Sequence, residues 1–525
     1  MKKVFALLLT AIMLVTFIAG CGTGSGQTSG GSAAEASKAE GTTAQAAADA
    51  GADKYKDAKE LELMAWWPIT MGNDDEVIKF MEKKFNVKLK LTLADWQPNI
   101  DNIATRVASG DYPDYLLMPY FWVNTLGSQY TALIDDGLIV NMSQAVKKYN
   151  LTNLQDQLNK AAQSNPKMIQ IYGKDGDFYS LPRHDGLPNP GMFIRKDWLD
   201  KLGLPAPKTT DDLYNVLKTF VEKQPDGKPT TGLTTEMALL EQIVTTFTGV
   251  HTSGWTKKDG VWTNKVMLPE YKEALKYLKK LYDDGLLDKE FAIAKIDDNR
   301  AKFLSGRAGA IMQNANRIDF IDFLQKPLAK YSADAVVACL PEFPKGPSGK
   351  RNGGSPYGSC GVLFKNADES KNERVLDILD WLLSPDGTDL SLNGVEGIHY
   401  NKQDGKVVYT DKWQTDFQGI EHHLIRHFIF PGITKEASPL FLGIPDCYNN
   451  YQDIIKNGVS EGVLGLNSEV TAEKYPKMED VYKKWFINFI SGKANIDTDY
   501  QKFLNEYDAA GYSTVLKEVE KYMAD

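Results

Sequence analysis

The first folded part of the chain alternates between strand-like and helix-like patterns of hydrophobic residues. Leu89, Leu91 and Leu93 alternate strictly with polar residues, which is the period of a strand with one buried face. Val77, Phe80 and Met81 instead have helical spacing. The pattern predicts a strand, a helix, a strand, a helix and a strand at 61–66, 74–85, 88–93, 99–109 and 115–118. This β-α-β-α-β order predicts a parallel sheet with helices on both faces, hence an α/β fold.

The rest of the chain is richer in amphipathic helices. Residues 209–221 carry hydrophobic side chains at positions 0, 3, 4, 7 and 8, counted from Leu213. Thr209 or Thr210 can cap this helix, and the following aspartates favour its dipole. Further helices are predicted at 271–285, 372–383 and 481–490. No internal repeat is visible.

The chain begins with a basic start, Met1-Lys2-Lys3, and an uncharged hydrophobic run that ends at Gly20. This pattern is typical of a secretory signal peptide, and the run is short for a stable membrane span. Ile18-Ala19-Gly20-Cys21 resembles a bacterial lipobox. The resemblance implies cleavage before Cys21, acylation of its thiol, and a lipid anchor on the outer face of the cytoplasmic membrane, as on a Gram-positive cell surface. An ordinary signal peptide with a chance cysteine is the alternative.

A flexible tether is expected after Cys21. Residues 22–52 contain no aromatic residue, Leu, Ile, Val or Pro, so they cannot bury enough apolar surface to offset their ordering entropy. Removal of residues 1–20, which carry two lysines, takes the formal net charge from −9 to −11. An acidic chain is a poor nucleic-acid binder. The remaining cysteines, Cys339, Cys360 and Cys447, fit no metal motif and are expected to be small buried side chains.

Several segments resemble one protein family. GDYPDYLLMP (110–119), YSLPR (179–183) and FIRKDWLDKLGLPAPKTTDDLYNVLKTF (193–220) are similar to blocks of the extracellular solute-binding proteins of ABC importers. FLSGRAGAIM, LLSPDG and GVEGIHY fit later blocks of the sugar-binding lipoprotein branch, called LplA- or LipO-like. The resemblance implies a two-lobe α/β fold of the type II periplasmic-binding-protein kind, with an inter-lobe hinge and a central cleft that closes on a ligand.

This fold implies that the chain crosses between the lobes more than once. Crossings are expected near 187–193, 305–310 and 353–361, where Pro and Gly are dense in two of the three segments. The expected organisation is a signal peptide, a lipidated linker, a first lobe and a second lobe. Their ranges are 1–20, 21–58, 59–190 plus 308–356, and 191–307 plus 357–525.

Large aromatic residues follow each of the first three predicted strands. In an open parallel sheet, a ligand binds at the carboxyl ends of the strands. Flat aromatic rings desolvate the C–H faces of sugars, and carboxylates and amides pair with sugar hydroxyls. The residues expected to contact a sugar are Trp66, Trp67, Asp95, Trp96, Tyr120 and Trp122. Packing of these rings in a core is the alternative.

Other candidate ligand-binding residues occupy predicted strand ends, crossings or glycine-punctuated loops. They are Arg183, His184, Asp185, Asn314, Asn316, Arg317, Tyr357, Glu396 and His399. A surface turn is the alternative for the first three. Trp255 and Trp262 flank a predicted hairpin and can pack on their own lobe instead, and Arg195 and Asp197 are expected to position the second lobe structurally.

Neither of two metal-like patterns is expected to bind an ion. His423 and His427 are four residues apart, but the glutamate of a zinc-peptidase motif is missing between them. Many relatives carry a calcium loop where this chain has QPDGKPTTGL, which keeps Asp226 but lacks the other oxygen ligands. No metal, cofactor or catalytic residue is expected.

The sequence therefore predicts a monomeric, non-enzymatic substrate-binding lipoprotein of an ABC importer. It would capture an oligosaccharide in the cleft and deliver it to the transmembrane permease subunits. Two alternatives remain open, a surface glycoside hydrolase and a peptide- or lipopeptide-binding receptor. No G-x-S-x-G elbow or P-loop is present, although carboxylates for glycoside hydrolysis are abundant.

Overall fold

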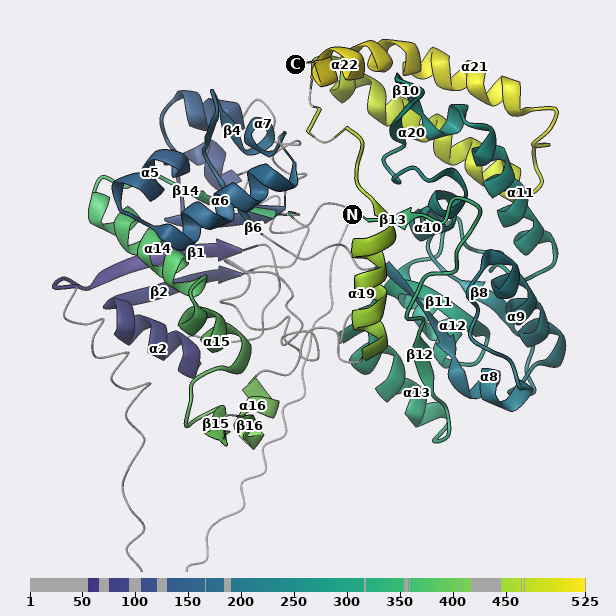
Figure 1. The fold of residues 1–525 in the computed structure, drawn as a ribbon, viewed down its shortest axis with the longest axis horizontal. Helices are drawn as coiled ribbons and strands as arrows, with labels where there is room; N and C mark the ends of the chain where they lie inside the picture. Colours follow the sequence, from purple (N-terminus) through teal and green to yellow (C-terminus); the bar gives the residue numbers. More distant parts are fainter. Residues whose placement is uncertain are drawn as a thin grey trace, which may run out of the picture. The chain divides into compact units, whose positions relative to one another are not determined.

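The described secondary structure is built around two larger sheets, each with its own helices (Figure 1). The structure is a computed structural model, and each part is described below by itself. It describes residues 55–65, 75–93, 105–119, 130–165, 167–183, 190–315, 318–353, 357, 359–404, 406–416, 445–463, 465–466 and 468–524.

The first sheet has five strands in the order β2-β1-β3-β14-β6. Their bounds are β1 Lys59–Ala65, β2 Val87–Leu93, β3 Tyr115–Pro119, β6 Leu181–Arg183 and β14 Ser359–Leu363. β1 pairs in parallel with both β2 and β3, which confirms the predicted parallel arrangement of these three strands. β14 enters between β3 and β6 and runs antiparallel to both.

Helices from two distant stretches of the chain build one core around this sheet. They are α2 Glu76–Phe85, α5 Met142–Lys148, α6 Thr152–Ser164, α7 Met168–Tyr172, α14 Glu369–Leu382 and α15 Pro385–Asn393. Val77, Met81 and Phe85 of α2 are buried, as their spacing predicts. Two hairpins and a short helix complete this lobe: β4 Gly173–Lys174 with β5 Asp177–Phe178, β15 Tyr400–Gln403 with β16 Lys406–Tyr409, and α16 Asp411–Asp416.

The second sheet has four strands in the order β12-β7-β11-β8. Their bounds are β7 Pro190–Arg195, β8 Thr231–Thr234, β11 Ala308–Asn314 and β12 Val337–Cys339. β11 is parallel to β8 and antiparallel to β7. A small hairpin, β9 Trp255–Lys258 with β10 Val261–Asn264, and a two-residue pairing of β13 Arg351–Asn352 with β17 Gly458–Val459 lie outside this sheet.

The second lobe is the more helical of the two. Its helices are α8 Lys196–Leu202, α9 Thr210–Lys223, α10 Met237–Thr248, α11 Pro269–Asp283, α12 Ile296–Leu304, α13 Lys326–Tyr331, α19 Pro445–Asn457, α20 Glu469–Ile490, α21 Tyr500–Ala510 and α22 Tyr512–Ala524, with a π-helical segment at Ile318–Gln325. Thr209 caps α9 in a capping box with Asp212, which confirms one of the two predicted caps. Trp255 is buried in this lobe's core and Trp262 packs against it.

The strand pairings revise the expected division of the chain into lobes. Residues 308–356 were expected in the first lobe, but β11 and β12 pair with β7 in the second sheet. Residues from 357 onward were expected in the second lobe, but β14 and α14 belong to the first core. The first lobe therefore contains described residues of 55–183 and 357–416, and the second contains those of 190–353 and 445–524. β14 is buried throughout and β11 is buried except for Asn314, so their sequence patterns do not specify a sheet.

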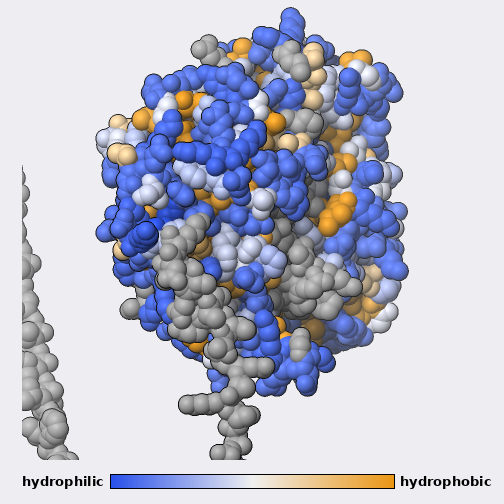
Figure 2. Space-filling model, turned by 60° about the vertical axis from the view of Figure 1, so that its left-hand side comes forward, coloured by the Kyte–Doolittle hydropathy of each residue, from blue (hydrophilic) through white to orange (hydrophobic). Residues whose placement is uncertain are grey.

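Cysteine burial and surface polarity agree with the sequence. Cys339, Cys360 and Cys447 are buried free thiols, as expected. Hydrophilic residues cover most of the face seen in Figure 2, with hydrophobic ones scattered among them. Within the described residues, no helix combines the length and hydrophobicity needed to cross a bilayer.

Candidate functional site

Four strands of the first sheet end at a single edge. β1, β2 and β3 are parallel, so their carboxyl ends, Ala65, Leu93 and Pro119, lie on the same side of the sheet. Ser359 pairs with Pro119 on one side and with Arg183 on the other, so β6 also ends there. In an open α/β sheet this edge is the usual place for a ligand. We call it the first-sheet edge.

Most of the predicted ligand-binding residues immediately follow these strand ends. Trp66, Trp67, Asp95, Trp96, Tyr120, Trp122, His184 and Asp185 lie outside the described residues, as does Cys21. The strands that precede them converge as the sequence predicted. The assignment of these eight residues to a ligand site stays a prediction.

Arg183 is the predicted residue that the structure describes at the first-sheet edge. Its Nη1 lies 3.4 Å from Ser359 Oγ, the residue beside it in the register. Burial lowers the pKa of Arg183 to about 10, while the nearby Tyr115 hydroxyl acts in the opposite direction. The group therefore remains a cation at neutral pH, and it can donate to the hydroxyl or carboxylate of a ligand.

A corresponding edge exists on the second sheet. β11 ends at Asn314, whose register partner is Pro190, the first residue of β7. β11 and β12 are both antiparallel to β7, so their carboxyl ends lie beside its start. Asn314 is exposed there, whereas Asn316 and Arg317 lie outside the described residues. We call this place the second-sheet edge.

A buried polar cluster at the second-sheet edge was missed by the sequence analysis. Arg351, which is 3% exposed, donates to Asp453 Oδ2 at 2.9 Å, to Asn450 Oδ1 at 2.9 Å and to the carbonyl oxygen of Pro190 at 2.6 Å. Burial lowers the pKa of the Arg351 guanidinium, and the Asp453 carboxylate opposes that shift. Arg351 directly precedes the glycine-rich segment predicted as a crossing between lobes. This position was the one feature of the sequence that pointed to Arg351. Its acidic partner is about a hundred residues away, so the sequence could not identify the pair.

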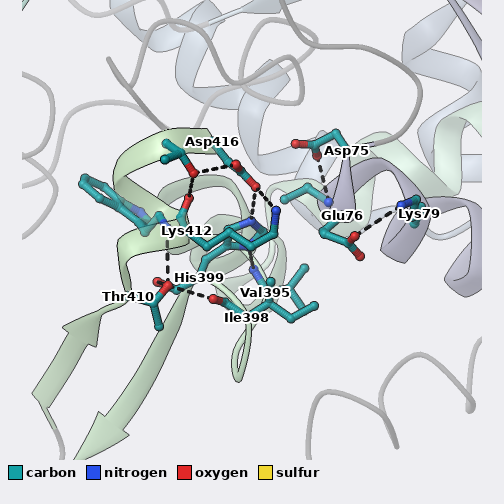
Figure 3. Close-up of polar contacts among 12 residues, drawn as sticks. Asp75, Glu76, Lys79, Val395, Ile398, His399, Thr410, Lys412 and Asp416 are labelled. Atoms are coloured by element: carbon teal, nitrogen blue, oxygen red, sulfur yellow. Dashed lines mark hydrogen bonds and ion pairs between the residues drawn. The ribbon is translucent and has the colours of Figure 1, made fainter. Parts of the chain in front are cut away.

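The glycine-punctuated loop that contains Glu396 and His399 has an internal structural role. His399 is fully buried; its Nδ1 accepts from the Val395 amide at 2.9 Å and its Nε2 lies 3.2 Å from Asp416 Oδ2 (Figure 3). Since both ring nitrogens are engaged, His399 is unsuited to contacting a ligand, which corrects the prediction. Glu396 is partly exposed and pairs with Lys402 at 3.4 Å.

Figure 3 also shows the start of α2 beside α16. Asp75 caps α2 by accepting from the Val77 and Ile78 amides, and Glu76 pairs with Lys79. Lys412 of α16 pairs with Asp416 at 2.8 Å. That hydrogen bond raises the pKa of Lys412, with a smaller contribution in the same direction from Glu76 and Asp75. These ion pairs lie within each helix, and the carboxylates at the start of α2 act on the Lys412 cation of α16 only through their charge.

Tyr357 lies in the first hydrophobic core and is 3% exposed. Tyr172 donates from its hydroxyl to the Tyr357 carbonyl oxygen at 3.4 Å. The prediction that Tyr357 faces a ligand from a crossing is therefore corrected, because the residue begins the return of the chain into the first sheet. Apolar packing beside β14 accounts for its position.

The loop with Asp226 is organised by side chains of this chain. The Asp226 carboxylate accepts from Arg195 Nη1 at 3.0 Å and from Trp198 Nε1 at 2.9 Å, and Arg195 also pairs with Asp197 at 2.6 Å. Arg195 thus has the structural role expected of it. In the part of the chain that the structure describes, no three His, Cys, Asp or Glu side chains gather as metal ligands. His423 and His427 lie outside it.

The chain has two α/β lobes, and in each of them strand ends meet at one edge of the sheet. This is the architecture of a two-lobed binding protein. The family model for bacterial extracellular solute-binding proteins matches residues 73–389, more than half of the sequence, so the chain belongs to that family.

Individual relatives extend over most of the chain. It is 26% identical over 467 residues to the polygalacturonan/rhamnogalacturonan-binding protein YtcQ of Bacillus subtilis, covering 85% of this chain and 88% of YtcQ. It is 25% identical over 483 residues to lipoprotein LipO of the same organism, covering 86% of this chain and 90% of LipO. An "HMO binding" ABC-transporter-associated solute-binding protein of Bifidobacterium longum infantis has a similar fold, with TM-score 0.66, 18% identity and coverage of 89% and 98% of the two chains.

Proposed function

We propose that this protein is the substrate-binding subunit of an ABC importer and that it captures an oligosaccharide between its lobes for delivery to a membrane permease. The observation that carries the proposal is the first-sheet edge, where parallel strands end directly before Trp66-Trp67, Asp95-Trp96 and Tyr120. The name of YtcQ, which specifies polygalacturonan and rhamnogalacturonan binding, supports a carbohydrate ligand.

The residue roles follow from sugar chemistry. Indole and phenol rings after the first three strands would cover the C–H faces of sugar rings, each burying about 150–250 Å². Arg183 would donate to hydroxyls from the end of β6, and Asn314 would do so from the second-sheet edge. No step changes the ligand covalently in this proposal, and release to the permease follows lobe opening.

Alanine substitution of Trp66, Trp67 and Trp122 tests this assignment. Each change is expected to weaken oligosaccharide binding about tenfold, because a stacking surface is lost while the strands that precede it remain. Calorimetry with a panel of neutral and acidic oligosaccharides measures the affinities. Tyr331→Ala is a matched control, since Tyr331 is 70% exposed on α13. Unchanged affinity in all three tryptophan variants would refute the site assignment.

We also propose that Cys21 carries a lipid that holds the protein at the outer face of the cytoplasmic membrane. The support is the Ile18-Ala19-Gly20-Cys21 motif after a hydrophobic run, together with the relative named as a lipoprotein. Cys21→Ala is expected to abolish incorporation of radiolabelled palmitate and to move the protein out of the membrane fraction. Continued labelling of that variant would contradict the proposal, and Cys447→Ala serves as the control because Cys447 is a buried thiol.

The same ligand panel separates the alternatives. A glycoside hydrolase would shorten the oligosaccharide during incubation, whereas a receptor raises its own thermal midpoint and leaves the sugar intact. A peptide receptor would respond to peptides and to none of the sugars.

A further inference from the structure

A pocket in the second lobe has the dimensions of a ligand site. Its volume is about 440 Å³, within the usual range for small-molecule sites, about 300–1,000 Å³. One wall is a single face of α19, because Asn449, Gln452, Asp453, Lys456 and Asn457 follow helical spacing. We call it the α19 pocket.

The opposite wall comes from two loops. Pro207 and Lys208 lie between α8 and α9, and Pro341 and Glu342 follow β12. The amide of Lys345 donates to the Lys208 carbonyl oxygen at 2.9 Å, which joins the two loops. The proline rings offer apolar surface opposite the amides of α19. This combination suits a sugar ring, which has C–H faces and a rim of hydroxyl groups.

The α19 pocket lies at the second-sheet edge. Leu340, next to Pro341, donates from its amide to the Met192 carbonyl oxygen at 2.9 Å, near the start of β7. Asp453 is held by Arg351, which also donates to the Pro190 carbonyl oxygen. The pocket is therefore attached to the strand end that pairs with Asn314. A ligand held at that edge could extend into it.

The charges of the pocket leave two cations available. The Asp453 carboxylate is paired with Arg351 at 2.9 Å, and Glu342 is paired with Lys345 at 2.9 Å. Nearby Asp212 is engaged by the amides of Lys208 and Thr209 at the start of α9.

Lys208 and Lys456 are both exposed, and neither has an ion-pair partner within the described ranges. The acidic side chains are thus compensated, and the two lysines can receive a ligand anion.

We propose that the α19 pocket binds a carboxylate-bearing sugar ring, a uronate, of the captured oligosaccharide. The lysines would pair with the sugar carboxylate, and the amides of Asn449 and Gln452 would bond to its hydroxyls, while the Asn457 amide nitrogen donates to Asp453 Oδ1 at 2.6 Å. This inference rests on the proposed function and specifies the charge class of its substrate. A neutral ring would gain little from the two lysines, so discrimination between acidic and neutral sugars would reside here.

Trigalacturonate and its fully methyl-esterified form provide matched probes. Both have the same length and hydroxyl groups, but only the first is charged. For the full-length mature protein, calorimetry at low ionic strength is expected to show about tenfold tighter binding of the acid. The double variant Lys208→Ala/Lys456→Ala is expected to reduce that preference to within about twofold, since charge-assisted hydrogen bonds are lost. Added salt is expected to reduce the preference of the unmodified protein.

The control is Lys330→Ala, which removes an exposed lysine of α13 outside the pocket and should keep the preference. Equal binding of acid and ester, binding of neutral sugars alone, or a preference that survives in the double variant would overturn this inference and leave the proposed function intact. Absence of binding to every oligosaccharide, acidic or neutral, would instead refute the proposed function itself.

Discussion

Replacing Arg351 with methionine is expected to lower the free energy of unfolding by about 3–5 kcal/mol, because it leaves the Asp453 carboxylate buried without its cation. Arg351 and Asp453 are 3% and 5% exposed, and Arg351 also binds Asn450 and the start of β7. Urea unfolding measures the loss. We expect it to be among the largest effects of a single substitution in this protein.

Lys350→Met is the matched control, since Lys350 is exposed next to Arg351 in the sequence. It is expected to change stability by less than about 0.5 kcal/mol. The double variant Arg351→Met/Asp453→Asn should be more stable than the sum of its single losses predicts, because the uncompensated charge is removed. Equal stabilities of Arg351→Met and Lys350→Met would show that the cluster does not stabilise the lobe.

Lys265→Met is expected to lower the free energy of unfolding by a similar amount, about 3–5 kcal/mol. The Lys265 ammonium lies 2.6 Å from Glu241 Oε2 and donates to the Thr252 carbonyl oxygen at 2.8 Å. Its partner Glu241 also accepts from the Tyr482 hydroxyl, whose pKa is raised by burial, so the phenol stays neutral and keeps donating. Loss of the lysine leaves a carboxylate inside the second core. Thermal and urea unfolding measure the change.

Lys258→Met provides the comparison for this pair, because Lys258 pairs with Glu270 at the surface. Surface ion pairs contribute about 0–1 kcal/mol, so its loss should be small. Lys265→Met/Glu241→Gln should recover part of the stability, since the glutamine amide retains an acceptor for Tyr482. An indistinguishable response of Lys265→Met and Lys258→Met would contradict the proposed importance of the buried pair.

The start of the first sheet was predictable because local patterns determine it. Strict alternation in 88–93 and helical spacing in 74–85 each specify an element, and short connections between successive elements require parallel strands. The structure confirms β1, α2, β2 and β3 and their parallel pairing. Helix caps such as that of Thr209 were predictable for the same reason.

The placement of the later strands depended on long-range pairing. Ala308–Asn314 and Ser359–Leu363 are buried nearly throughout, and neither pattern distinguishes one sheet from the other. The expected lobe boundaries therefore placed both strands incorrectly. Sequence analysis recognised that the chain crosses between lobes but could not determine which lobe receives each segment.

In the candidate site, too, residues placed by their neighbours in the sequence were predicted correctly, and residues whose role depends on distant segments were not. Arg183 and Asn314 lie at sheet edges, as expected from their positions after strands. His399 and Tyr357 also looked accessible from their loops, but burial and partners contributed by other segments give them structural roles. Arg351 was missed because its function depends on Asp453 and Asn450, which α19 brings from a distant part of the sequence.

The insertion of β14 between β3 and β6 has a consequence for biogenesis. Pro119 has Ser359 as its register partner, 240 positions later, so β14, the strand that joins β6 to the rest of the first sheet, is synthesised long after its neighbours. A chain that is synthesised from its amino terminus cannot complete this sheet until residue 363 has been added. Until then the edge of β3 that pairs with β14 stays open, and an open strand edge can pair with other chains, so completion of this sheet depends on the late arrival of β14.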